Sequence, residues 1–339
     1  MRQVVIPRHG PPDVLTVREV PDPAVTPPPG TVRIRVRAAG INFSDLLARQ
    51  GLYPGAPKPP AVVGYEVAGV IDAADGPSKV IALTKFGGQS ELVVVPAANV
   101  FPLPANWSFE EGAAFPVVYL TAHHLLTRVA AARRGETVLI HAAAGGVGLA
   151  VAELSRILGL RLIGLASRGK HAILREYGVE PLDSRDARWP EAVRALAPNG
   201  VDIVLDAVGG DSWRRGYDLL APLGRLVCYG ASELSTGRGR TLLRTVWKAL
   251  RWPRFSPIRL MSENRAVLGV NLGNLWDSAH IIRPQVEALL RYADEGTIRP
   301  RVDRAFPFDQ AAAAHRSLHE RKNVGKVVLV PDNGVDAGM

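Results

Sequence analysis

The chain has 339 residues, 47% of them hydrophobic and 22% charged, a composition typical of a globular protein. This length exceeds what one hydrophobic core usually organises, and it predicts two domains. The N-terminal residues contain no apolar signal-peptide core, no stretch has the length of a membrane span, and the single cysteine, Cys228, excludes an internal disulfide and a multi-cysteine zinc cluster. These features predict a cytoplasmic protein. The net charge of +9 favours anionic partners such as phosphorylated cofactors, coenzyme A esters, acidic lipid or nucleic acid.

The first 115 residues contain short alternating segments, which predict an irregular, mostly β domain. Thr31–Arg37 alternates strictly, as a half-buried strand does. Further strands are expected at residues 2–6, 14–20, 62–71, 80–83 and 91–95. Ser108 precedes Glu111 by three residues, and this spacing predicts a capped helix start.

Three polar side chains stand out within residues 38–61. Ser44 is expected to cap a short helix, and a rigid glycine–proline turn around Tyr53 follows that helix. Polar groups on a helix start and a turn suit a binding site, which makes Asn42, Asp45 and Tyr53 candidates. The alternatives are local turn and cap hydrogen bonding for the first two, and core or surface packing for the tyrosine.

From Pro116 onward, helices of about a dozen residues or more alternate with short apolar strands, a pattern typical of a doubly wound parallel sheet. The strands are expected at residues 138–140, 161–165, 179–182, 201–206 and 225–229. The first of them leads into the glycine turn Gly145-Gly146-Val147-Gly148. There Gly145 and Gly146 let the backbone approach a pyrophosphate, and Gly148 lets the following helix pack close to the strand. The helix N-terminus adds free N–H groups, so the turn predicts a dinucleotide site.

The segment after the second strand of this sheet selects the cofactor. An NAD site places a carboxylate there for the ribose 2′-hydroxyl. This chain instead has Ser167, Arg168 and Lys170, a hydroxyl and two cations that suit a 2′-phosphate. NADPH is therefore expected rather than NADH. The alternative is two solvated basic side chains at a helix start.

Residues 234–262 interrupt the alternation with seven Lys or Arg residues and no acid. Leu243, Val246, Trp247 and Leu250 fall on one face of a helix that Pro253 ends. This basic segment fits a lid over an anionic substrate, a subunit contact or a helix on a membrane surface. The alternative is a helix that packs its apolar face on its own protein.

The last part of the chain predicts a strand at 267–272, helices at 284–295 and 308–320, and a final strand at 327–330. His315 and His319 have the i, i+4 spacing of a possible metal pair. No carboxylate is arranged as a third ligand, so both are expected to be surface histidines.

In this order of domains the whole chain resembles the medium-chain dehydrogenase/reductase superfamily. It is most similar to the quinone oxidoreductase and enoyl thioester reductase branch, and within that to the vesicle amine transport protein 1-like group. The resemblance is carried by stretches at residues 40–54, 62–71, 115–126, 141–150, 201–210 and 322–331. It implies an α/β fold, with a Rossmann-type doubly wound parallel sheet and a GroES-like, mostly β catalytic domain. The expected domains are residues 1–115, a nucleotide-binding domain at 116–270 that contains the basic segment, and a return segment at 271–339.

The resemblance also bears on zinc and on the reaction. Zinc alcohol dehydrogenases of this superfamily carry Gly-His-Glu where this chain has Gly64-Tyr65-Glu66, and they use cysteines that it lacks. No zinc is therefore expected. The zinc-free members reduce a C=C bond conjugated to a carbonyl, in quinones, enones, or acyl-CoA and acyl-carrier thioesters.

Site residues follow from the same resemblance. A tyrosine at the position of Tyr53 donates the proton in the thioester reductases, and Asn42 would stabilise the developing charge. Asn42, Asp45 and Thr121 would lie by the nicotinamide and its ribose. The rest of the cofactor cleft would be formed by Val208, Tyr229, Gly230 and Asn271, with Asn323 and Lys326 closing it. One departure concerns Ser184, which stands where many quinone reductases have a tyrosine near the adenine end.

The sequence thus predicts a zinc-independent, NADPH-dependent reductase of activated C=C bonds. The surplus positive charge favours an enoyl-CoA substrate, and a quinone or enone is the alternative. An alternative of another class is a nucleotide-regulated protein that binds membrane or lipid through the basic helix around Trp247 and Trp252. RNA binding has only the net charge in its favour. By resemblance, a homodimer that pairs the nucleotide-domain sheets edge to edge is expected.

Overall fold

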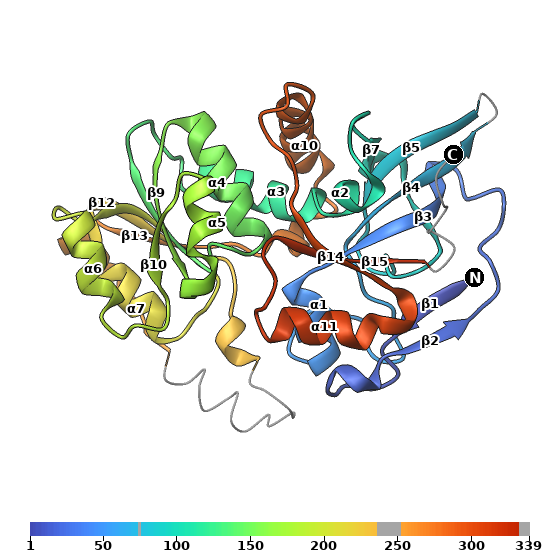
Figure 1. Cartoon of the computed structure of the whole chain (residues 1–339), viewed down its shortest axis with the longest axis horizontal. Helices are drawn as coiled ribbons and strands as arrows, with labels where there is room; N and C mark the ends of the chain where they lie inside the picture. The colour runs from blue at the N-terminus through green and yellow to red at the C-terminus, as the bar shows by residue number, and fades with distance from the viewer. Residues whose placement is uncertain (74–75, 236–251, 332–339) are drawn as a thin grey trace. The chain divides into compact units, whose positions relative to one another are not determined.

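The computed structural model describes residues 1–73, 76–235 and 252–331. These residues form two compact units (Figure 1). The first contains the described residues of 1–120 and 273–331, and the second contains those of 121–272. Within these ranges no helix combines the length and the apolar character that crossing a membrane requires.

The first unit is built on a largely antiparallel sheet around β3 (Thr31–Ile41). Its strand order is β14-β15-β3-β4-β5-β7, with β6 also paired to β3. The alternating side chains Ile34 and Val36 are buried, as the strict alternation predicts, and β3 continues four residues past the expected end. The other strands of this unit are β1 (Arg2–Val5), β2 (Thr16–Glu19), β4 (Glu66–Ala73), β5 (Gly76–Leu83), β6 (Leu92–Pro96), β7 (Val100–Pro102), β14 (Val302–Pro307) and β15 (Lys326–Val330).

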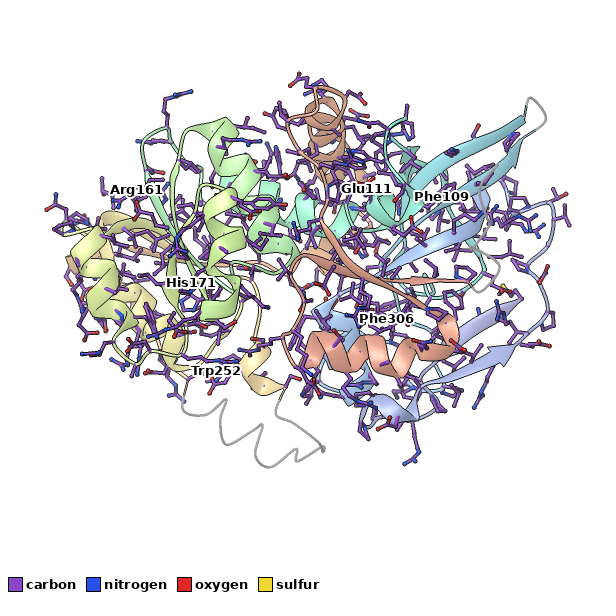
Figure 2. All side chains as sticks on the ribbon, viewed as in Figure 1. Phe109, Glu111, Arg161, His171, Trp252 and Phe306 are labelled. Atoms are coloured by element: carbon purple, nitrogen blue, oxygen red, sulfur yellow. The ribbon has the colours of Figure 1, made fainter. Side chains whose placement is uncertain are left out.

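Short helices and turns surround this sheet. The helices are α1 (Phe43–Gln50), α2 (Phe109–Ala113), α3 (Pro116–His123), α10 (Ala279–Asp294) and α11 (Ala311–His319), and the 3₁₀ turns are η1 (Pro12–Val14), η2 (Ala97–Asn99), η6 (Leu272–Leu275) and η7 (Phe308–Gln310). The predicted cap of α2 is confirmed. Glu111 N–H donates to Ser108 Oγ at 3.2 Å, and Ser108 N–H donates to the Glu111 carboxylate at 2.9 Å. Two N–H groups that the helix itself leaves unpaired are thereby satisfied. Figure 2 labels Phe109 and Glu111, the first and third residues of this helix.

The second unit contains the predicted doubly wound sheet. Its strands run parallel in the order β10-β9-β8-β11-β12-β13, so the direction of winding reverses between β8 and β11. The strands are β8 (Thr137–His141), β9 (Arg161–Ala166), β10 (Glu180–Asp183), β11 (Val201–Asp206), β12 (Leu220–Cys228) and β13 (Ala266–Gly269). The point of reversal is where ligands bind in open α/β sheets.

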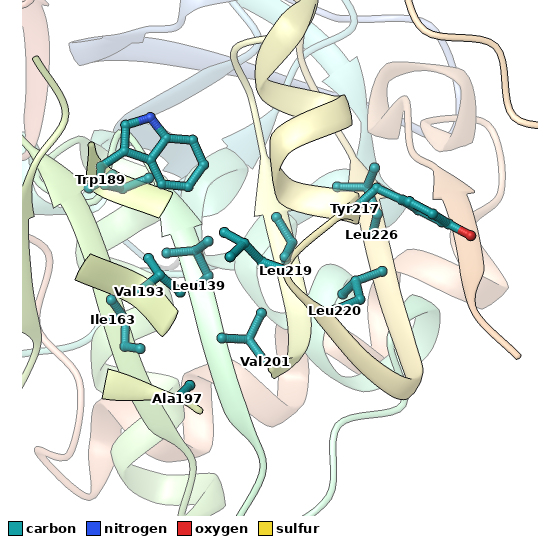
Figure 3. Packing of buried hydrophobic residues seen from close by; sticks show 12 residues of the cluster. Leu139, Ile163, Trp189, Val193, Ala197, Val201, Tyr217, Leu219, Leu220 and Leu226 are labelled. Atoms are coloured by element: carbon teal, nitrogen blue, oxygen red, sulfur yellow. The ribbon is translucent and has the colours of Figure 1, made fainter. Parts of the chain in front are cut away.

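Helices connect these strands, and an apolar core lies against one face of the sheet. The helical segments are the π-helical turn η3 (His124–Val129), α4 (Gly146–Leu158), η4 (Arg168–Lys170), α5 (His171–Glu176), α6 (Trp189–Leu196), α7 (Asp211–Tyr217), η5 (Ser232–Leu234) and α9 (Pro257–Glu263). Leu139 and Val201 from the strands belong to one core with Trp189 and Val193 from α6 and with Tyr217 from α7 (Figure 3). Burying each such side chain stabilises the fold by about 1.5–3 kcal/mol.

The structure corrects several local predictions. Among the described helices between strands of the second unit, only α4, with 13 residues, reaches the expected length, because α5, α6, α7 and α9 have six, eight, seven and seven residues. Asn42, not Ser44, is the N-cap residue of α1. The helix expected at 284–295 begins five residues earlier, at Ala279, with Pro284 inside it.

Two further predictions concern histidines and the basic segment. His315 is fully buried on α11, so it is not the surface residue that the sequence suggested. The α11 face that carries it packs inward, because Ala311 and Ala314 on the same face are buried as well. The predicted helical face of the basic segment, with Leu243, Val246, Trp247 and Leu250, lies outside the described residues.

Candidate functional site

In the first unit, the start of α1 gathers the polar residues that the sequence singled out. Asp45, in the first turn, is fully buried. Its carboxylate accepts hydrogen bonds from the backbone N–H of Asn42 at 2.7 Å and of Gly64 at 3.0 Å. Burial raises the pKa of its carboxyl to about 7, although both backbone bonds act in the opposite direction. Asp45 therefore makes the cap hydrogen bond that was the alternative to a ligand-binding role for this residue.

The side chain of Asn42 belongs to a buried charged triad with Glu66 and Lys326. Lys326 Nζ lies 2.6 Å from Glu66 Oε1 and donates to Asn42 Oδ1 at 2.5 Å. Asn42 Nδ2 donates to the same Glu66 oxygen at 2.9 Å. The other oxygen, Glu66 Oε2, accepts the N–H of Val117 in the first turn of α3 at 2.6 Å. A buried charge pair with this many hydrogen bonds fixes the rotamers of all three side chains.

These groups do not fit a zinc ion. The position where zinc enzymes of the superfamily have a histidine carries Tyr65, and the carboxylate of Glu66 is already paired with an ammonium group. Across the described ranges, no cluster of three or more His, Cys, Asp or Glu side chains is arranged to hold a metal. Zinc sites need at least three such ligands.

An aromatic group lies in the same unit. The ring of Tyr53 packs edge-on against Tyr65 with centroids 6.2 Å apart, and Tyr65 contacts Phe86 at 5.3 Å. Tyr65 is buried, and burial raises the pKa of its phenol. Tyr53 is half-buried, so of the two tyrosines it is the one that remains partly exposed to solvent. The contact with the buried ring of Tyr65 restricts the orientation of the Tyr53 ring and leaves Tyr53 partly exposed.

In the second unit, the glycine turn joins β8 to α4. Ala142 holds a left-handed conformation, with φ of 56°, and Gly145 is the N-cap residue of α4. A Cβ at Gly148 would lie 2.1 Å from the carbonyl oxygen of Ala143, so only glycine permits this approach of helix and turn. The first N–H groups of a helix have no partner within it, and they lie at the positive end of the helix dipole, where anions bind.

A buried carboxylate and a buried imidazole meet at the point where the sheet reverses. Asp206 ends β11, is fully buried, and accepts the N–H groups of Val208 at 2.6 Å and Gly209 at 3.1 Å. His141 ends β8, and its Nε2 lies 3.5 Å from Asp206 Oδ2. Its ring stands edge-on to Trp189 with centroids 5.3 Å apart. Burial lowers the pKa of His141, so the imidazole is neutral at physiological pH.

The predicted cofactor-selecting residues lie at the carboxyl end of β9, next to the last residue of β10. Ser167 is the N-cap residue of η4, which contains Arg168 and Lys170. Arg168 is 80% exposed and donates through Nε to Asp183 at 2.9 Å. Only this nitrogen is engaged by Asp183, so the outer edge of the guanidinium faces solvent. Such an edge can bind two phosphate oxygens at once.

The other predicted residues fall in both units. Thr121, Val208, Tyr229, Gly230 and Asn271 belong to the second unit, and Asn323 and Lys326 belong to the first. The N–H of Val208 donates to Asp206, and its carbonyl accepts Glu233 N–H at 2.9 Å, so this N–H is not available to a ligand. Asn323 donates to the carbonyl of Gly325 at 2.7 Å.

Sequence reasoning overlooked three residues of these clusters. Asp206 and Asp183 each end a short strand of the parallel sheet, and a carboxylate at that edge was a usable signal. Glu66 entered only as a comparison with zinc enzymes, although an acid that opens an apolar strand needs a charged partner. Nothing in the sequence pairs it with a lysine 260 residues later.

A β-rich unit and a doubly wound unit with a glycine turn are the architecture of two-domain dehydrogenases and reductases. A family model for the alcohol dehydrogenase GroES-like domain matches residues 28–105, and one for zinc-binding dehydrogenases matches residues 178–329. The synaptic vesicle membrane protein VAT-1 homolog of Rattus norvegicus is 40% identical over an alignment of 344 positions. This alignment, gaps included, covers 98% of this chain and 84% of the relative.

Two solved structures extend the comparison. The quinone oxidoreductase of Thermus thermophilus, solved also as its complex with NADPH, is 37% identical with a TM-score of 0.82, over 97% of this chain and 100% of that one. The CurK enoyl reductase is 26% identical with a TM-score of 0.83, over 97% and 99%. The chain therefore belongs to the medium-chain dehydrogenase/reductase superfamily, together with the VAT-1 homologs and the quinone oxidoreductases.

Proposed function

We propose that this protein is a zinc-independent, NADPH-dependent reductase of C=C bonds conjugated to a carbonyl group. The observation that carries the proposal is the glycine turn at the point where the parallel sheet reverses. Gly148 lets α4 approach the turn closely there, because a Cβ would lie 2.1 Å from the carbonyl oxygen of Ala143, and the positive end of α4 thereby stands at the turn. The solved quinone oxidoreductase and enoyl reductase that this chain resembles support the same reaction class.

The residues of the second unit fit a phosphorylated dinucleotide. Gly145, Gly146 and Val147 would present their backbone to the pyrophosphate, while Ser167, Arg168 and Lys170 would hold the 2′-phosphate that distinguishes NADPH from NADH. Asp183 keeps the arginine in place for that contact. When bound, the reduced nicotinamide supplies a hydride to the β-carbon of the conjugated carbonyl.

The residues of the first unit would handle the proton and the developing negative charge. Tyr53 would donate a proton to the α-carbon, so that hydride and proton together saturate the double bond. Asn42 has two N–H bonds on its amide nitrogen, and Glu66 uses one of them. The second can donate to the substrate carbonyl oxygen, in an orientation that Lys326 fixes by donating to the amide oxygen.

The substrate class that we propose is an enoyl thioester such as an acyl-CoA. The net charge of +9 would attract its phosphates. A quinone is the second candidate, supported by the identity of 37% to a quinone oxidoreductase. The role of Tyr53 is tested by Tyr53→Phe, with Tyr292→Phe on α10 as the matched control. We expect Tyr53→Phe alone to lower kcat while NADPH affinity stays unchanged, and an unchanged kcat on the best substrate would exclude Tyr53 as the acid.

We also propose that the protein is a homodimer paired through the second unit. Strand β13 is the edge of its sheet, and three apolar side chains near it are exposed: Leu223 at 75%, Ile258 at 79% and Met261 at 77%. Leu223 N–H donates to the carbonyl of Asn264, directly after α9, which places this side chain beside the helix that carries the other two. Exposed apolar groups next to the outer edge of a sheet favour association. Sedimentation of the double variant Ile258→Glu/Met261→Glu tests this: it should be a monomer.

A further inference from the structure

One loop of the second unit is held by a buried carboxylate. Asp206 is fully buried at the end of β11, and one of its oxygens accepts two successive backbone N–H groups, those of Val208 at 2.6 Å and Gly209 at 3.1 Å. Gly209 and the residue after it both hold left-handed conformations, with φ of 90° and 65°. Few residues other than glycine adopt this conformation. The two hydrogen bonds to Asp206 fix the backbone where these left-handed residues begin.

The same loop is bonded to the segment that follows β12. Tyr229 N–H donates to the carbonyl of Asp206 at 3.0 Å, Ser232 N–H donates to that of Ala207 at 3.0 Å, and Glu233 N–H donates to that of Val208 at 2.9 Å. A Cβ at Gly230 would lie 2.8 Å from the carbonyl oxygen of Ala207. The two segments therefore form one rigid wall at the carboxyl edge of the sheet, and Asp206 joins it to the sheet.

The second carboxylate oxygen of Asp206 faces inward. It lies 3.5 Å from Nε2 of His141, which is 6% exposed and packed edge-on against Trp189. The last residues of β8 and β11, the two strands between which the winding reverses, thus lie side by side through these two side chains. The other oxygen of Asp206, Oδ1, is the one that accepts the two N–H groups of the loop.

We propose that Asp206 is a positioning residue for the cofactor: it orders the loop Ala207–Gly210 before the nucleotide binds and thereby sets the affinity for NADPH. The inference rests on the proposed function, because it assumes that NADPH binds at this edge of the sheet, where the family resemblance leads us to expect Val208, Tyr229 and Gly230 in the cofactor cleft. Asp206 itself touches neither cofactor nor substrate. It acts through two backbone N–H groups, which no other acceptor of the loop replaces.

Removal of the carboxylate leaves two amides of the loop without their acceptor. An unpaired N–H is stable only where water reaches it, so the loop must open to hydrate both groups. The loop then samples several conformations, of which only one binds the cofactor. The apparent dissociation constant for NADPH rises in inverse proportion to the fraction of molecules in that conformation. Asp206→Asn keeps one acceptor oxygen of the same size and should retain most of the order.

Hydrogen exchange of the nucleotide-free protein tests the ordering step directly. In Asp206→Ala the amides of residues 207–210 should exchange at least about tenfold faster than in the wild type, the loss expected for one or two bonds to a charged acceptor. Asp202→Ala is the matched control, because Asp202 lies in the same strand at its other end and accepts the N–H of Thr137 at 2.8 Å. This control should speed exchange near Thr137 and leave residues 207–210 unchanged.

Nucleotide titration, followed by NADPH fluorescence or calorimetry, tests the consequence. Asp206→Ala should weaken NADPH binding by about tenfold, Asp206→Asn by much less, and Asp202→Ala by less than about twofold. If Asp206→Ala does not fold, Asp206→Glu replaces it, since a longer side chain keeps the charge and displaces the oxygen. Unchanged exchange of residues 207–210, or unchanged NADPH affinity in a variant whose loop has opened, would overturn the inference. A wild-type protein that binds neither NADPH nor NADH would instead refute the proposed function, and the exchange experiment would still decide whether Asp206 orders the loop.

Discussion

Replacing Lys326 by methionine should strongly destabilise the first unit. The ammonium group lies 2.6 Å from Glu66 Oε1 with side-chain exposures of 5% and 0%. Methionine keeps the length and volume of the side chain and removes its charge, which leaves a buried carboxylate with only two neutral donors, Asn42 Nδ2 and Val117 N–H. Removing one partner of a buried ion pair costs about 3–5 kcal/mol. This corresponds to a decrease in Tm on the order of 10 °C.

The assay is urea and thermal denaturation of the full chain, followed by tryptophan fluorescence. Lys85→Met is the matched control, because Lys85 pairs with Asp277 at 2.8 Å but with exposures of 61% and 83%. This surface pair should contribute less than about 1 kcal/mol. The double variant Lys326→Met/Glu66→Gln should recover at least half of the loss, since it removes the stranded charge as well. If Lys326→Met costs no more than Lys85→Met, the buried triad is not an ion pair in solution, and the orientation that we assign to Asn42 loses its basis.

Three further variants test other parts of the structure. Burial lowers the pKa of His315 to about 3, below that of an unfolded histidine, so its contribution to stability is complete above pH 6.5 and is lost as the pH falls toward 3. His315→Leu should therefore reduce the loss in unfolding free energy between pH 7.5 and pH 5 by about 2 kcal/mol, measured by urea denaturation at both pH values, and an unchanged loss would contradict the prediction. Gly148→Ala, whose Cβ would lie 2.1 Å from the Ala143 carbonyl oxygen, should lower Tm and abolish nucleotide binding in a titration. Arg168→Gln should raise the dissociation constant of NADPH about tenfold more than that of NADH, and equal effects on both would assign the arginine to its pair with Asp183 alone.

The fold of the second unit can be predicted from the sequence because β8, β9 and β11 are short and largely apolar. The expected and observed bounds of β11 agree at Val201–Asp206, and β8 and β9 extend at most one residue beyond each expected end. Helix lengths are harder to predict. The segments between strands are long enough for helices of a dozen residues, but tight turns and 3₁₀ segments such as η4 occupy part of them.

The candidate site can be predicted only in part, because its decisive contacts are long-range. The glycine turn is local, and its spacing fixes its structure. Serine and asparagine are both good N-caps, so the sequence alone cannot choose between Ser44 and Asn42 for α1. Asn42 is the cap in the structure, where its side chain donates to the distant Glu66. Likewise, the spacing of His315 and His319 gives no sign that one side of α11 is packed inward.

The most direct test of the proposed function is oxidation of NADPH and NADH, followed by absorbance, with crotonyl-CoA, a branched enoyl-CoA and a benzoquinone as acceptors. We predict saturable turnover of an enoyl-CoA, with NADPH preferred over NADH. Turnover of the quinone alone would replace the thioester by the second candidate substrate and keep the reaction class. Binding of NADPH without turnover of any acceptor would contradict the proposal that this protein is a reductase of conjugated carbonyl compounds.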